Sequence, residues 1–408
     1  MQLPSRRSYP ETVDRSSIMT EHDWNIPEPA VLNRVRTRLE ASATEATEDV
    51  LATIVSVEGN AYRRPGAKML FAADGTHSGS LTPGCLEDAL QKAAADVRDS
   101  GTIQYVTYDM MEDDDVWGLG IGCHGIIDVL LEPLTAQYQP AVDAFANRED
   151  IAVITVIDSE TGVHSRGDRA YYDPVDDRFT IPAGGSDNWP EDMLADPARK
   201  MATHGRSTVL TITDADNELT VFIDGVAARP ELVIFGSGHD VEPVTELAAK
   251  NEFHVTVVGF RGGIPLSERF PYADETYATS PGSIEDIISL HDRTYAVVMT
   301  HNFVDDLLTI ETLLNSPAAY IGLMGPRERF EQLLGELSES GATVTASALD
   351  RVYTPIGLNL GGGSPYQIAH SIVAELLAVH NEQEPAHLQS HAGPIHGRVA
   401  AEILKEDS

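Results

Sequence analysis

Apolar residues follow two different patterns of spacing in the two halves of the 408-residue chain. In the first half, "VLATIVSVEG" (50–59) and "AKMLFAADG" (67–75) have the composition of strands, and Asp74-Gly75 is a hairpin-type turn signal. In "CLEDALQKAAADVRDSG" (85–101) the apolar residues recur at i, i+3 and i+4, which predicts a helix that ends at Gly101. Short strands are predicted around 103–110, 125–133, 151–159 and 207–214, with turns between them. This half therefore predicts a mixed α+β domain.

From Glu231 the pattern alternates between buried strands and amphipathic helices. "ELVIFGSG", "DVEPVTELAAKN" and "FHVTVVGF" form one β-α-β unit, and the alternation continues to residue 380. The last helix is the best marked, because Ser364 can cap it, Pro365 suits its first position and Gln367 completes a capping box. We expect an α/β chain in which this half is a Rossmann-like, doubly wound parallel sheet.

These patterns divide the chain into four parts. We expect a flexible tail at 1–28, an N-terminal domain with a β-rich extension at 29–229, a Rossmann-like domain at 230–380 and a C-terminal tail at 381–408.

The charge balance says little about the fold, but it restricts which partners the protein can bind. Acidic residues outnumber basic ones 64 to 28, for a formal net charge of −36, so nucleic acid and anionic membranes are poor partners. Such an excess of carboxylates is typical of adaptation to a salt-rich cytosol (a halophilic protein). Two cysteines and no long apolar stretch predict a soluble, cytoplasmic protein in a reducing compartment.

"FGSGHDVEP" (235–243) is a glycine turn between a buried strand and a helix, where backbone N–H groups receive phosphate. Gly236 and Gly238 are its key residues. A full dinucleotide fingerprint would have a third glycine near Val241 and an acidic residue after the second strand, where Gly259 and Arg261 stand. The pattern favours a ligand with an extra phosphate, which Arg261 would meet; a purely structural turn is the alternative.

Two further segments follow predicted strands and therefore reach the same edge of the sheet. In "MTHNFVDD", His301 and Asp306 are candidates either for ligand contact or for capping and hydrogen bonding at a helix start. In "GLMGPRERF", Arg327 and Arg329 fit solvated helix positions better than a binding role.

The two thiols lie in glycine-rich surroundings. Cys85 stands at or just before a helix start, where unpaired N–H groups favour the thiolate, although a buried, inert thiol is the alternative. Cys123, followed by His124, lies in "GLGIGCHG", whose four glycines imply tight turns. These residues do not match a structural zinc pattern, but one thiolate can hold a soft metal ligand.

Arg63 and Arg64 occupy a Pro/Gly turn in "EGNAYRRPGAKML", a rare positive spot in this chain. The turn either carries solvated arginines or binds an anion.

Together these motifs resemble the XdhC/CoxI family, accessory proteins of molybdenum hydroxylases such as xanthine dehydrogenase. In the region 45–135 the resemblance rests on "RRPGAKMLFAADG", "GSLTPGCLEDAL" and "GLGIGCHGIIDVLLEP". In the region 230–380 it rests on "FGSGHDVEP", "VVMTHNFVDD", "YIGLMGPRERF" and "TPIGLNLGGGSPYQIAHSIVAELLAV". Thr82-Pro83 replaces the commoner Ser-Gly-Gly before the cysteine.

The resemblance implies a maturation chaperone rather than a catalyst. Such a protein binds molybdenum cofactor (molybdopterin, possibly as a dinucleotide) and protects it while a cysteine desulfurase installs the sulfido ligand. It then delivers the cofactor to an apo-molybdenum hydroxylase of the xanthine dehydrogenase or carbon monoxide dehydrogenase type, and family members are often homodimers. Cys85 occupies the position of the family's cofactor-binding cysteine and would contact the metal, with Cys123 in support and Gly236, Gly238 and Asp240 at the phosphate or nucleotide end.

Two alternatives remain open. One is an NAD(P)-dependent oxidoreductase with a redox-active Cys85, against which the missing ribose carboxylate argues. The other is a scaffold that recruits the hydroxylase and the desulfurase and binds no small molecule.

Overall fold

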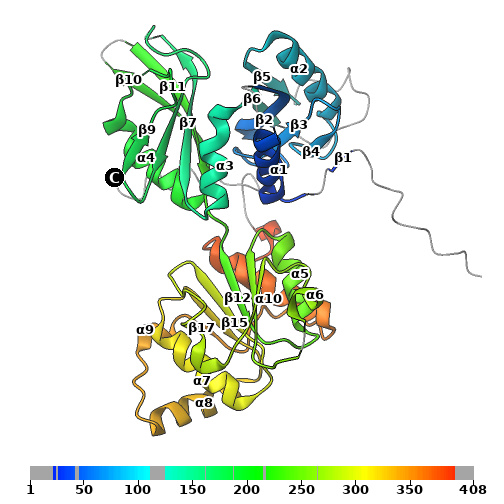
Figure 1. Cartoon of the computed structure of the whole chain (residues 1–408), viewed down its shortest axis with the longest axis vertical. Helices are drawn as coiled ribbons and strands as arrows, with labels where there is room; N and C mark the ends of the chain where they lie inside the picture. The colour runs from blue at the N-terminus through cyan, green and yellow to red at the C-terminus, as the bar shows by residue number, and fades with distance from the viewer. Residues whose placement is uncertain are drawn as a thin grey trace, which may run out of the picture. The chain divides into compact units, whose positions relative to one another are not determined.

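The computed structural model describes residues 22–23, 26–41, 46–110, 125–160, 162–186, 188–214, 217–263 and 265–390. The fold divides between Val226 and Ala227 into two compact units, here called the N-terminal unit and the Rossmann unit (Figure 1). Within the described ranges, no helix combines the length and apolar character needed to cross a bilayer.

The N-terminal unit contains two sheets and four helices among its described residues. Its helices are α1 (Glu28–Ala41), α2 (Glu87–Ser100), α3 (Gln139–Ala146) and α4 (Glu191–His204). The first sheet has the order β1-β4-β3-β2-β6-β5, from β1 (His22–Asp23), β2 (Ala46–Gly59), β3 (Lys68–Phe71), β4 (His77–Gly79), β5 (Gln104–Asp109) and β6 (Gly125–Thr135). The second, fully antiparallel sheet has the order β10-β11-β7-β8-β9, from β7 (Ile151–Ser159), β8 (Arg169–Asp173), β9 (Arg178–Thr180), β10 (Ser207–Asp214) and β11 (Asn217–Val226).

Most predicted elements of this unit are confirmed, but α4 was not predicted. The helix has Pro197 in its interior, and proline there removes a backbone hydrogen bond, so the residue acts as a false stop signal. The burial of Leu194, Ala198 and Met201 against the second sheet outweighs that cost. The expectation of strands and turns for this stretch was therefore wrong.

Apolar side chains from both sheets meet in the unit's interior. Val55 and Leu130 of the first sheet pack with Ile157 and Phe222 of the second. Helix α2 covers the other face of the first sheet, and α4 covers the other face of the second.

A buried ion pair also joins the two sheets. Lys68 of β3 places Nζ 2.9 Å from Oδ2 of Asp224 of β11, and both side chains are almost fully buried. The ammonium donates to the carbonyl of Gly66 at 2.7 Å, and Ser207 Oγ donates to the other carboxylate oxygen at 2.8 Å. Burial disfavours the charged ammonium, but the Asp224 carboxylate, together with Tyr138 and Glu28, outweighs it and keeps the pKa of Lys68 above its usual value. The pair is therefore ionised in the fold.

A second ion pair crosses the same interior. Arg169 Nη2 of β8 lies 2.6 Å from Glu132 Oε2 of β6, and the guanidinium lies 5.4 Å from the centre of the Tyr138 ring. Burial raises the pKa of the Tyr138 hydroxyl, which stays neutral beside the pair. Two buried pairs thus fix how the sheets face each other.

The Rossmann unit is built on a six-stranded parallel sheet, which confirms the predicted fold class. Its order is β14-β13-β12-β15-β16-β17, from β12 (Glu231–Phe235), β13 (His254–Gly259), β14 (Glu275–Ala278), β15 (Thr294–Val298), β16 (Tyr320–Leu323) and β17 (Val352–Tyr353). Its helices are α5 (Val241–Lys250), α6 (Leu266–Arg269), α7 (Phe303–Asn315), α8 (Arg327–Glu339), α9 (Ala346–Leu349) and α10 (Pro365–His380).

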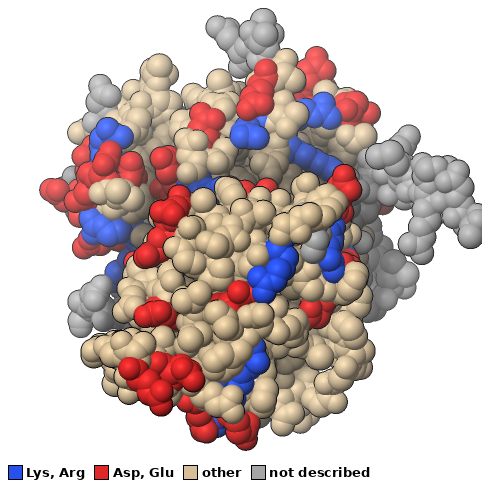
Figure 2. Space-filling view, turned by 60° about the horizontal axis from the view of Figure 1, so that its bottom comes forward, with Lys and Arg blue, Asp and Glu red and all other residues tan. Residues whose placement is uncertain are grey.

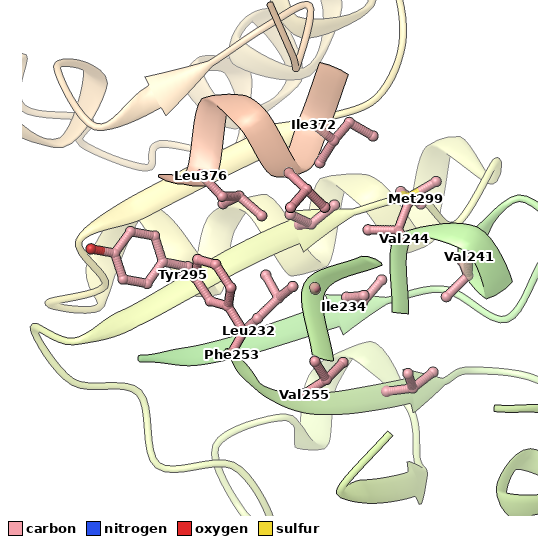
Figure 3. Packing of buried hydrophobic residues seen from close by; sticks show 14 of the residues in the cluster. Leu232, Ile234, Val241, Val244, Phe253, Val255, Tyr295, Met299, Ile372 and Leu376 are labelled. Atoms are coloured by element: carbon pink, nitrogen blue, oxygen red, sulfur yellow. The ribbon is translucent and has the colours of Figure 1, made fainter. Parts of the chain in front are cut away.

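Alternate residues of the central strand face opposite layers. Leu232 and Ile234 pack under α5 and α10, as Figure 3 shows, whereas Val233 and Phe235 pack under α7 and α8. The capping box predicted for α10 is present, and Gln367 Oε1 accepts from the N–H of Ser364 at 3.2 Å.

We predict that Lys68→Met destabilises the N-terminal unit by about 3–5 kcal/mol, because it leaves the Asp224 carboxylate buried without its partner. Urea unfolding of the full chain, followed by far-UV circular dichroism, measures the change. Lys250→Met is the matched control: Lys250 pairs with Glu246 on an exposed helix face, where ion pairs contribute little. If Lys68→Met is as stable as this control, the buried Lys68–Asp224 ion pair does not stabilise the unit as described.

Candidate functional site

The carboxyl edge of the parallel sheet brings three predicted segments together. From β12 the chain crosses to β13 on one side, and β15 pairs with β12 on the other. Such a switch point leaves a crevice beyond the strand ends, where ligands of open α/β sheets bind. The turns after β12, β13 and β15 all reach this edge.

The turn after β12 depends on Gly236. Its φ of 142° favours glycine, and a Cβ added there would lie 2.3 Å from the carbonyl oxygen of Met299. The turn is therefore pressed against the end of β15. At Gly238 an added Cβ would meet the side chains of Asp240 and His301 and no backbone atom, so that residue is less constrained by backbone contacts.

Asp240 and His301 link the two turns. The Oδ2 atom of Asp240 lies 2.7 Å from Nε2 of His301, and His301 has a left-handed φ of 57°, which is uncommon for a residue other than glycine. The Asp240 side chain makes no capping hydrogen bond to α5. In the first turn of α5, however, Pro243 has no N–H and the N–H of Val241 donates to the carbonyl of Gly238 at 3.3 Å, so this helix start has fewer N–H groups to offer a ligand than an ordinary one.

Two neighbouring carboxylates at the start of α7 are held by arginines. Arg261 forms an ion pair with Asp305, and Arg329 Nε lies 2.9 Å from Oδ2 of Asp306, which is 2% exposed. Thr300 donates to the other Asp306 oxygen. Arg327 is exposed, as the sequence indicates, but the solvated role expected for Arg329 is wrong because this arginine neutralises a buried carboxylate.

The cap of α7 is Asn302, whose Oδ1 accepts from the N–H groups of Val304 and Asp305, each at 3.0 Å. The capping role considered for His301 and Asp306 therefore belongs to their neighbour, although Asp306 is hydrogen-bonded as that alternative required. An asparagine directly before an apolar helix start is itself a capping signal.

Charge at this edge is balanced rather than uniformly positive. Asp240, Asp305 and Asp306 each have a histidine or arginine partner. Carboxylates and the fewer cations are also interspersed on the face of the molecule drawn in Figure 2. Anion binding at the turn would therefore rely on backbone N–H groups more than on net charge.

Cys85 lies in the turn between β4 and α2. It is half-buried, and it precedes the cap residue Leu86. The buried carboxylate of Glu87 accepts from Thr82 Oγ1 at 2.8 Å and from the N–H of Leu86 at 3.0 Å. Thr82, which departs from the commoner family lead-in, is thus the partner of a buried glutamate.

The arginine turn is linked to two of the other N-terminal motifs. Cys85 packs in one apolar cluster with Ala61, where the arginine turn begins. A Cβ at Gly125, at the start of β6, would lie 2.6 Å from the carbonyl of Asn60. The structure therefore links segments that are 24 residues apart (Ala61 and Cys85) and 65 residues apart (Asn60 and Gly125) in the sequence.

Within the arginine turn, Arg63 Nη2 lies 2.7 Å from Glu28 Oε2, and Arg64 is exposed. Cys123 and His124 lie outside the described residues. Over the part of the chain that is described, no three His, Cys, Asp or Glu side chains form a group able to hold a metal ion. A metal held at Cys85 would have to bring most of its ligands with it.

Two models of one protein family match the sequence of this chain. The XdhC and CoxI family model matches residues 28–109, and the XdhC Rossmann domain model matches residues 232–376. The chain is 32% identical over 351 residues to a probable xanthine dehydrogenase subunit of Bacillus subtilis (strain 168), covering 85% of this chain and 97% of that protein. The chain therefore belongs to the XdhC/CoxI family.

Two further relatives span most of the chain. The molybdenum cofactor insertion chaperone PaoD of Escherichia coli (strain K12) is 22% identical over 369 residues, covering 89% of this chain and 94% of PaoD. The crystal structure of a xanthine dehydrogenase from Bacillus halodurans is similar with a TM-score of 0.69 and 27% identity. It covers 88% of this chain and 98% of that chain.

We predict that Gly236→Ala destabilises the Rossmann unit by about 1–3 kcal/mol, because the added methyl group meets the Met299 carbonyl and φ is unsuitable. Gly262→Ala is the control, since a Cβ there has open space and no positive φ. Thermal unfolding of both variants tests this. Equal melting temperatures would show that the turn is looser than described.

Proposed function

We propose that this chain is a molybdenum cofactor-binding accessory protein. It holds the cofactor during sulfuration and delivers it to a molybdenum hydroxylase of the xanthine dehydrogenase or carbon monoxide dehydrogenase type. The observation that carries the proposal is the half-buried Cys85 in the same cluster as the start of the arginine turn, in a chain of the XdhC/CoxI family.

The donor set at Cys85 fits this cofactor. A thiolate is a ligand that soft metal centres prefer, and guanidinium groups bind phosphate oxygens through paired N–H donors. When bound, the cofactor supplies a molybdenum centre that carries its own sulfur and oxygen ligands, together with a phosphate group. That composition suits a unit that offers the thiol of Cys85 and the arginine turn but no cluster of metal ligands among its described residues.

Residues of the Rossmann unit are proposed to bind a phosphate or nucleotide group. Gly236 and Gly238 allow the close approach, and N–H groups of the glycine turn before α5 would donate. Asp240 and His301 hold the turn in shape, while Arg261 and Asp306 lie beside it through their ion pairs.

The proposal also includes a cellular location, two partner proteins and a second thiol. The chain would act in the cytoplasm, with an apo-hydroxylase and a cysteine desulfurase as partners, and Cys123 would assist Cys85. Half-burial of the thiol supports a protective role, because it limits the access of water and oxidants to a bound centre.

The test is the pterin content of the purified protein after exposure to molybdenum cofactor, measured as fluorescence of the oxidised pterin. We expect wild type to retain pterin and Cys85→Ala to retain at least about tenfold less, since even outer-shell changes weaken metal binding by that factor. Ser100→Ala, at the exposed far end of α2, should match wild type.

Other outcomes would contradict the proposal in distinct ways. A wild-type chain that takes up no pterin when it is supplied would refute cofactor binding. Equal retention by wild type and Cys85→Ala would remove the thiol from the site. Binding of NADP⁺ with turnover of a small substrate would favour the oxidoreductase alternative.

A further inference from the structure

The arginine turn lies against the start of β10, in a region that no recognised motif covers. A Cβ added at Gly66 would lie 2.4 Å from Ser207 Oγ, and the N–H of Gly66 donates to the carbonyl of Ile54 at 2.8 Å. Only a glycine allows this approach. The turn that carries Arg64 is therefore in contact with the residue that follows Arg206.

Arg206 is itself held in place by its backbone. Gly205 ends α4 in a left-handed conformation, and the N–H of Arg206 donates to the carbonyl of Met201 at 3.1 Å. Its carbonyl accepts from the N–H of Gly225 at 2.9 Å, and a Cβ at Gly225 would lie 2.6 Å from that oxygen. The half-buried side chain of Arg206 thus projects from a rigid junction of α4, β10 and β11.

The buried ion pair supports both arginine-bearing segments. Lys68 binds the carbonyl of Gly66, and its partner Asp224 accepts from Ser207, so one network holds the arginine turn and the start of β10. On the other side of the turn, Arg63 pairs with Glu28. Arg64 and Arg206 are therefore positioned by neighbours on both sides.

Arg64 and Arg206 lie on two segments that touch each other, which is unusual for two cations in a chain with a net charge of −36. Burial lowers the pKa of Arg206, and the positive charge of Arg64 lowers it further. Both effects favour an oxyanion at this point, because it offsets the repulsion and accepts charge-assisted hydrogen bonds from two guanidinium forks.

We propose that Arg206 and Arg64 together form a binding site for a phosphate or pyrophosphate group, to which the junction between α4 and the second sheet contributes an essential residue. The arginine turn begins at Ala61, which packs against the same apolar cluster as Cys85, and the anion site lies in the same unit as that thiol. Naming that ligand as molybdenum cofactor rests on the proposed function, whereas the anion site itself does not.

The experiment is calorimetric titration of the full chain with inorganic pyrophosphate at constant ionic strength. We expect wild type to bind, Arg206→Gln and Arg64→Gln each to bind about tenfold more weakly or worse, and Arg206→Lys to recover part of the loss. Arg178→Gln, an exposed arginine of β9 paired with Asp176, removes the same charge elsewhere and should leave the affinity unchanged.

Absence of pyrophosphate binding by wild type would overturn the inference, as would unchanged affinity in Arg206→Gln. If Arg206→Gln does not fold, the exposed Arg64→Gln and the conservative Arg206→Lys decide the question. A wild-type chain that binds pyrophosphate through both arginines but takes up no pterin would leave this site standing and refute the cofactor proposal. If the chain takes up pterin but its affinity for pyrophosphate is the same in the Arg64 and Arg206 variants as in wild type, this anion site is refuted and the cofactor proposal stands.

Discussion

The buried ion pair between Lys68 and Asp224 is the interaction on which the N-terminal unit most depends. Two charges taken out of water cost several kcal/mol each, and only close pairing with further hydrogen bonds offsets that cost. Here the further bonds come from the carbonyl of Gly66 and the hydroxyl of Ser207. The pair therefore fixes the arginine turn and the start of β10 at the same time, in the same unit as the half-buried thiol.

In the Rossmann unit, the charged side chains at the carboxyl edge of the sheet pair with one another. Its carboxyl edge has a buried Asp306 that Arg329 neutralises and an Asp240–His301 contact that joins two turns. Because these side chains are engaged with one another, what the edge offers an anion is chiefly backbone N–H groups at a glycine turn. The two units thus present complementary chemistry, with a soft thiol and guanidinium groups in one and main-chain donors in the other.

Local patterns in the sequence predicted the elements that depend on local physics. The parallel sheet follows from buried strands that alternate with amphipathic helices, and the start of α10 follows from its capping box. The helix α4 was missed because Pro197 is a local stop signal that packing against the second sheet overrides. Arg206 and Arg329 were missed or misassigned because their partners are distant in sequence, and no local pattern records a contact between segments so far apart.

The central claim is that the thiol at position 85 contacts molybdenum, and X-ray absorption at the molybdenum K edge tests it most directly. The measurement uses the cofactor-loaded chain with selenocysteine in place of Cys85, so that a ligand from this position is distinguishable from the sulfur that the cofactor brings. We predict a selenium scatterer in the first coordination shell of molybdenum. A loaded chain whose molybdenum has only sulfur, oxygen or nitrogen neighbours would contradict the claim.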